Sequence, residues 1–192
     1  MKRKVSLHVL IPLLLLTPAL LRAQSHMTFN NLPLTGTIDE MAGKLMEQGF
    51  RHIKSDNNII YMKGRHLNRM CEVVLLGTPL TQTVWKVYVA LPKASTWLSL
   101  KNDFTLLQKQ LEGQNGFAET IQTFQPPFLD GDGREMQGLM GGKCTWLTVW
   151  KKAQGTLLLE IQQSAKIGLS YEDGANLKVK HEEERQLSTS RP

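Results

Sequence analysis

Hydrophobic and polar positions follow two rhythms along this chain, and each rhythm predicts a type of element. Residues 38–46 carry apolar side chains on one side of a helix, and Thr37 with Glu40 has the pattern of a capping box that would begin it. A second helix is expected over residues 96–112. Its apolar residues recur at spacings of three and four: Leu100, Phe104, Leu107 and Leu111.

Short segments of alternating or β-branched residues surround the two helices and predict strands. Four lie between the helices and four after the second helix: residues 50–54, 58–63, 70–76 and 83–91, then 117–124, 143–151, 156–162 and 167–171. The alternation over 83–91 places Trp85, Val87 and Val89 on the apolar side of that strand. Residues 125–142 contain two prolines and five glycines, so we expect mostly loop there.

This order of helix, strands, helix and strands predicts the fold class. It is typical of a two-layer α+β domain, in which both amphipathic helices pack on one face of an antiparallel sheet. TATA-box-binding-protein-like and β-lactamase-inhibitor-protein-like folds have the same order, an analogy of shape that implies no activity. We expect a single domain over residues 24–177 and a charged, disordered tail over residues 178–192.

The first 23 residues have the features of a secretory signal peptide. Basic residues 2–4 precede an apolar run, residues 9–16, that is too short to span a bilayer. Cleavage is expected after Ala23, with Ala19 as the alternative. Since no cysteine lies near either site, we expect an exported protein, periplasmic or extracellular, that is not a lipoprotein. No later apolar run is long enough for a membrane span.

Removal of this leader changes the charge balance. The whole chain has 23 Lys and Arg residues against 17 Asp and Glu residues, a net charge of +6. Four of the basic residues and none of the acidic ones lie in the leader, so the processed chain would carry a net charge of +2. The basic character belongs mostly to the leader, and we expect no nucleic-acid partner.

The motifs of several enzyme classes are missing from the sequence. It contains no Gly-x-Ser-x-Gly pentapeptide, no glycine-rich phosphate loop and no clustered metal ligands, and we expect no metal and no cofactor. Cys71 and Cys144 would enter an oxidising compartment, where they either form a disulfide or stay as two thiols. Neither cysteine lies in a Cys-x-x-Cys motif or beside a histidine, so a catalytic thiol is not indicated.

Two pairs of residues are candidates for binding. Asp130 and Asp132 begin like a calcium loop, but Arg134 stands where the next oxygen ligand is needed, so a glycine turn is the better explanation. Trp146 and Trp150 would share one face of a strand. If that face is exposed, they form a binding surface.

Residues 29–37, which lead into the first helix, and residues 130–137, which lead to Lys143, Cys144 and Thr145, resemble a family of small exported proteins of Bacteroides-type bacteria. The resemblance spans most of the chain after the leader. It implies export and overall size, and it supplies no catalytic residue because the family has no established activity.

Two functions remain open from the sequence. The first is a non-catalytic exported module that recognises a protein or a glycan through one sheet face or through the loop of residues 125–142. The alternative is a hydrolase that uses carboxylates of that loop, namely Asp130, Asp132 and Glu135. The sequence gives no indication of the oligomeric state.

Overall fold

The computed structural model describes residues 25–189, which form an eight-stranded sheet, a small hairpin and four helices. The predicted signal peptide, residues 1–23 with its cleavage sites after Ala19 and Ala23, lies outside the described residues. None of the helices in residues 25–189 is long and apolar enough to cross a membrane.

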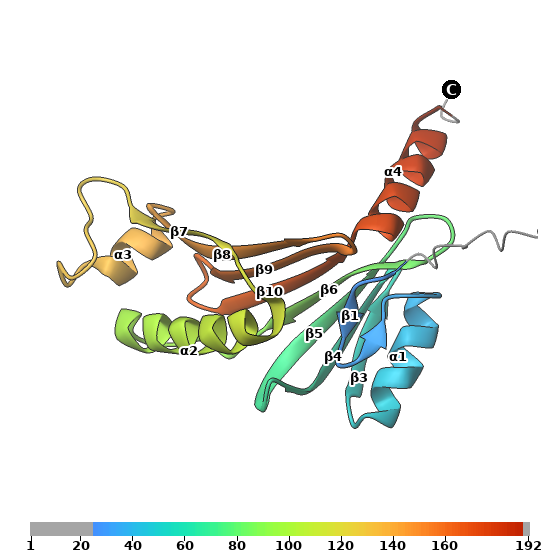
Figure 1. The fold of residues 1–192 in the computed structure, drawn as a ribbon, viewed down its shortest axis with the longest axis horizontal. Coiled ribbons are helices and arrows are strands. Elements are labelled where there is room, and N and C mark those ends of the chain that lie inside the picture. The colour runs from blue at the N-terminus through green and yellow to red at the C-terminus, as the bar shows by residue number, and fades with distance from the viewer. Residues whose placement is uncertain (1–24, 190–192) are drawn as a thin grey trace, which may run out of the picture.

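The strands of the large sheet pair antiparallel in the order β3-β4-β5-β6-β10-β9-β8-β7. They are β3 (Arg51–Asp56), β4 (Ile59–His66), β5 (Arg69–Gly77), β6 (Val84–Ala90), β7 (Glu119–Phe124), β8 (Cys144–Lys152), β9 (Gly155–Ile161) and β10 (Ile167–Asp173). Each half of the chain supplies four neighbouring strands, and β6 pairs with β10 where the halves meet (Figure 1). All eight predicted strands are confirmed, with ends that differ by at most three residues.

Both predicted helices are present and begin where local hydrogen bonding allows. α1 (Ile38–Glu47) starts with the predicted capping box: Thr37 Oγ1 accepts from the Glu40 amide at 3.3 Å, and Glu40 Oε2 accepts from the Thr37 amide at 3.1 Å. α2 (Trp97–Asn115) begins after Thr96, whose hydroxyl caps it. α1 packs on β3 to β5 and α2 on β9, on the same side of the sheet (Figure 1).

The face of the sheet under these helices, called the inner face, holds the core. Burial alternates along β4, β5, β8 and β9, where about one residue in two is shielded from solvent. The inner-face residues of the central strands are fully buried: Val73, Leu75, Val87, Val89, Leu157, Leu159 and Leu169. The predicted two-layer α+β fold, with both amphipathic helices on one face, is confirmed.

A hairpin that the sequence analysis did not predict precedes α1. β1 (Thr28–Phe29) pairs with β2 (Leu32–Pro33) through a two-residue turn. In that turn Asn30 and Asn31 have φ angles of 48° and 62°, as a type I′ turn requires, and asparagine tolerates this left-handed conformation. Phe29 is fully buried, so the hairpin is part of the inner layer.

The prediction that residues 178–192 form a disordered tail is wrong over most of that range. α4 (Gly174–Thr189) continues from β10, and Glu183 within it is buried. Its carboxylate accepts from the Leu80 amide at 2.6 Å and from the Thr81 hydroxyl at 2.6 Å, both in the loop between β5 and β6. The charged composition of this segment predicted disorder, because composition carries no information about a contact between residues about a hundred positions apart.

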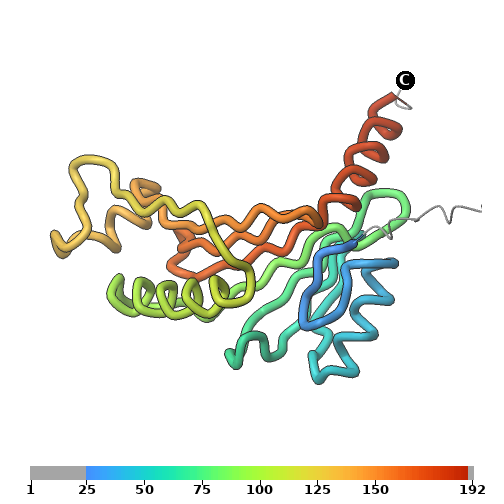
Figure 2. The backbone as a smooth tube through the Cα atoms, viewed as in Figure 1, coloured from blue at the N-terminus to red at the C-terminus, as the bar shows by residue number. Residues whose placement is uncertain are grey.

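The expected loop at residues 125–142 is mostly confirmed. It contains one short helix, α3 (Glu135–Met140), and the segment projects at the end of the molecule opposite α4 (Figure 2).

The predicted position of Trp85, on the apolar side of its strand with Val87 and Val89, is wrong. A register shift between Leu76 and Gly77 interrupts the pairing of β5 with β6, and Trp85 lies half-buried outside the core, with Lys180 Nζ 5.0 Å from its ring centre.

Candidate functional site

Asp130, a predicted binding residue, is held by two side chains of α2. It accepts a hydrogen bond from Trp97 Nε1 at 3.0 Å and one from Lys101 Nζ. The hydrogen bond from Lys101 keeps the pKa of the Asp130 carboxyl below its usual value. These contacts hold the loop against the first turns of α2, so the role of Asp130 in the fold is structural.

Asp132 and Glu135 shape the same loop. Asp132 accepts from the Leu129 amide at 3.0 Å and from the Arg134 amide at 2.8 Å, and Glu135 accepts from the Gly131 amide at 2.8 Å. Arg134 also donates from Nη2 to Asp132. Each carboxylate thus closes a turn, in agreement with the glycine-turn interpretation of this sequence.

Trp146 and Trp150 do not form the predicted binding surface. Both lie on the inner face, with exposed fractions of 5% and 1%. The Trp146 ring packs edge-on against Trp97, with ring centres 5.0 Å apart, and Trp150 Nε1 donates to the Gly116 carbonyl at 3.1 Å. The alternation in β8 identified the shared face correctly, but that face belongs to the core.

Cys71 and Cys144 are free thiols, so the disulfide considered from the sequence is not formed. Cys71 lies in β5 and Cys144 in β8, with β6, β10 and β9 between them. Four strand spacings of about 4.8 Å place the two strands about 19 Å apart, whereas a disulfide requires Cα atoms within about 7 Å. Burial raises the pKa of both thiols to about 11, which makes them unreactive at neutral pH.

The second face of the sheet, called the outer face, carries a continuous row of paired side chains. Residues directly opposite each other on neighbouring strands share a face, so the register of the sheet links one residue from each strand. The row crosses the whole sheet in this order: Lys54, Tyr61, Val74, Tyr88, Ser170, Leu158, Val149 and Glu119. Apart from Ser170, which is buried, the middle of the row is largely apolar and partly exposed, and its two ends are charged.

A groove of about 670 Å³ opens along the β3 to β6 half of this row. Tyr61, Val74 and Tyr88 line it, and the charged side chains around it are Arg51, Lys54, Lys63, Lys166 and Glu72. Lys166 Nζ and Glu72 Oε2 are 3.0 Å apart and offset each other, while Lys54 Nζ lies 4.4 Å from the ring centre of Tyr61. Basic groups therefore outnumber acidic ones at the groove.

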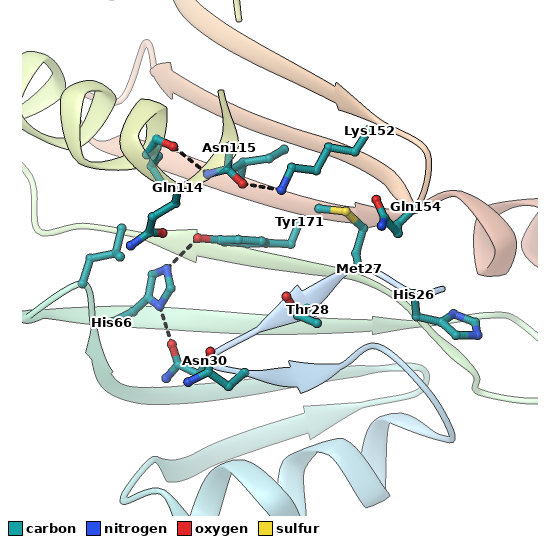
Figure 3. A pocket seen from close by; sticks show the side chains of 14 residues that line it. His26, Met27, Thr28, Asn30, His66, Gln114, Asn115, Lys152, Gln154 and Tyr171 are labelled. Atoms are coloured by element: carbon teal, nitrogen blue, oxygen red, sulfur yellow. Dashed lines mark hydrogen bonds between the residues drawn. The ribbon is translucent and has the colours of Figure 1, made fainter. Parts of the chain in front are cut away.

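A separate cavity of about 370 Å³ lies on the inner side of the molecule. The turn of the β1–β2 hairpin, the end of α2 and the turn between β8 and β9 surround it (Figure 3). Polar side chains that line it include Asn30, Asn31, Gln114, Asn115 and Gln154.

His66 forms the deepest polar contact of this cavity. Its Nδ1 lies 2.6 Å from Asn30 Oδ1 and its Nε2 lies 2.7 Å from Tyr171 Oη, as Figure 3 shows. Since a carboxamide oxygen only accepts, Nδ1 carries the proton and Nε2 accepts from the tyrosine. Burial lowers the pKa of His66 to about 4, so the imidazole is neutral at physiological pH.

Comparison with known proteins gave no relative. A scan against protein-family models, a search of curated proteins and a search of solved structures each found no match. The resemblance to small exported proteins of Bacteroides-type bacteria stays a prediction from the sequence.

Neither the residues of the outer-face row nor the inner cavity could be predicted from the sequence. The row depends on the register of seven strand pairs, which short alternating segments do not specify. One signal for the turn beside the cavity was available: Asn30 and Asn31 stand between short apolar segments, and asparagine tolerates the left-handed backbone that both central positions of a type I′ turn require.

Proposed function

We propose that this protein is an exported, non-catalytic binding module that recognises an acidic surface of a partner protein through the outer face of its sheet. The observation that carries the proposal is the row from Tyr61 to Val149, in which large, mostly apolar side chains stay partly exposed on both sides of the buried Ser170. Contiguous apolar surface with a polar rim is typical of protein interaction sites.

The composition of the groove favours an acidic partner. Tyr61 and Tyr88 offer large, rigid contact surfaces, and tyrosine is enriched among the residues that dominate binding energy. The surrounding Arg51, Lys54 and Lys63 would face the partner with positive charge. Complementary charge at the rim steers association and selects the partner, so binding should weaken as salt increases.

The carboxylates of the alternative hydrolase have other partners. Asp130 is held by Trp97 and Lys101, and Asp132 and Glu135 close turns of their own loop. A glycosidase of this type needs two carboxyl groups that face each other across the substrate. The contacts of these three residues favour recognition over that reaction.

Photo-crosslinking in the producing cells tests the proposal. A photoreactive amino acid replaces Val74, in the middle of the outer-face row, and in a matched control it replaces Leu106, which is 60% exposed on α2. We expect one discrete protein adduct from position 74, no such adduct from position 106, and loss of the adduct at high salt. Equal adducts from both positions, a carbohydrate adduct, or no adduct from position 74 would contradict the proposal.

A further inference from the structure

The inner cavity has a lining of unusual composition. Five carboxamide side chains surround it: Asn30, Asn31, Gln114, Asn115 and Gln154. They come from three separate parts of the chain, the β1–β2 turn, the end of α2 and the β8–β9 turn, which only the folded structure brings together. No Asp or Glu side chain is among the lining residues within the described part of the chain.

The charged and titratable groups at the cavity are neutral or already bonded. Lys152 Nζ donates to Asn115 Oδ1, and His26 Nδ1 lies 3.1 Å from Asp173 Oδ2. His66 is neutral and shares its ring nitrogens between Asn30 and Tyr171. The lining offers a cation no carboxylate, and it offers an anion only the exposed ammonium of Lys152, which already donates to Asn115. Most of the polar groups are neutral carboxamides, so the cavity suits an uncharged ligand better than an ionic one.

Several carboxamide groups keep their hydrogen-bonding capacity. Within residues 25–189, the side chains of Asn31, Gln114 and Gln154 have no hydrogen-bond partner, and the Nδ2 of Asn30 is free because only its Oδ1 contacts His66. A carboxamide offers both donors and an acceptor, as a ligand with many hydroxyl groups requires. Met27, Leu111 and Leu157 add an apolar wall for the carbon faces of such a ligand.

We propose that this cavity binds a neutral saccharide unit, with the carboxamides of Asn31, Gln114 and Gln154 hydrogen-bonding its hydroxyl groups. The size agrees, because cavities of a few hundred cubic ångströms hold small ligands. The cavity lies on the inner side of the sheet, opposite the outer face, so this inference is independent of the partner proposed above. A protein partner and a saccharide could be bound at the same time.

The test uses the full exported chain and saturation-transfer NMR with neutral mono- and disaccharides at millimolar concentration: glucose, galactose, N-acetylglucosamine and their disaccharides. We expect at least one of them to bind the wild type. In the double variant Asn31→Gly/Gln114→Ala the affinity should fall about tenfold or more. Both residues are exposed, and glycine accepts the left-handed backbone of position 31, so the thermal unfolding midpoint should change little.

Asn102→Ala is the matched control, because it removes a carboxamide from an exposed position of α2 outside the cavity. Its affinity should equal that of the wild type. The proposal is overturned if none of these saccharides binds, if the double variant binds as tightly as the wild type, or if Asn102→Ala weakens binding equally. Displacement of a bound saccharide by a short peptide, with no saccharide contact to Gln114, would assign the cavity to peptide instead.

Discussion

Burial of His66 makes the stability of this fold depend on pH, and one substitution should remove that dependence. Burial lowers the pKa of His66 from 6.5 to about 4, because the imidazolium form loses its hydration. In the unfolded chain His66 has its ordinary pKa, so it binds a proton below about pH 6.5, whereas in the folded state it binds that proton only below about pH 4. The stabilisation from this group is therefore fully present above pH 6.5 and is lost as the pH falls toward 4.

The magnitude follows from the two pKa values. Within this window each pH unit lowers the free energy of unfolding by about 1.4 kcal/mol, so a fall from pH 6.5 to about pH 5 removes about 2 kcal/mol. The variant His66→Gln keeps an oxygen that can accept from Tyr171 Oη and does not titrate. The other titratable groups are the same in both proteins, so the difference in the stability that each protein loses on acidification comes from His66.

Urea denaturation followed by tryptophan fluorescence measures this effect at about pH 7.5 and about pH 5. We expect the wild type to lose about 2 kcal/mol more than His66→Gln on acidification. His52→Gln is the control, because His52 is exposed in β3 and should leave the wild-type response unchanged. If wild type and His66→Gln lose stability in parallel, His66 is not buried as the structure has it.

Three further substitutions or assays test other parts of the structure. Glu183→Ala removes the carboxylate that accepts from the Leu80 amide and the Thr81 hydroxyl, so it should lower the free energy of unfolding by about 2 kcal/mol and speed amide hydrogen exchange in α4. Unchanged exchange would mean that α4 does not dock on the loop between β5 and β6. Gly64→Ala places a Cβ 2.2 Å from Phe50 Cδ1 and should destabilise the fold by about 1–3 kcal/mol. Gly113→Ala, which has open space around it in α2, should be neutral or stabilising by up to about 1 kcal/mol, and equal effects of the two substitutions would contradict the packing of Gly64 against Phe50. Thiol titration of the unfolded, non-reduced protein should find both Cys71 and Cys144 free, and a missing pair of thiols would contradict the strand order.

Elements with a strong local signal could be predicted from the sequence. The alternation of β5, β6, β8 and β9 and the capping box at Thr37 depend on residues a few positions apart, so both appear in the chain itself. The order of elements then gives the two-layer class, because an apolar helix stripe and an apolar strand face must cover each other.

Features that depend on contacts between distant residues could not be predicted. Trp146 and Trp150 share a face, but only the sheet as a whole decides that this face points to the core. Trp85 leaves the core because the pairing of β5 with β6 shifts register. The cavity around His66 joins residues as far apart in the chain as His26 and Tyr171. The docking of Glu183 holds a helix that composition alone assigns to disorder.

The most direct test of recognition through the outer face uses the partner protein identified by crosslinking, once it is purified. The measurement is its dissociation constant for the wild type and for two charge-reversal variants. Lys54→Glu/Lys63→Glu reverses two exposed charges at the groove, and Lys44→Glu/Lys109→Glu makes the same change of charge on the exposed sides of α1 and α2. We predict that the first variant binds at least about tenfold more weakly than wild type and that the second binds as wild type does. Equal weakening by both variants, or wild-type affinity in the first, would contradict the account.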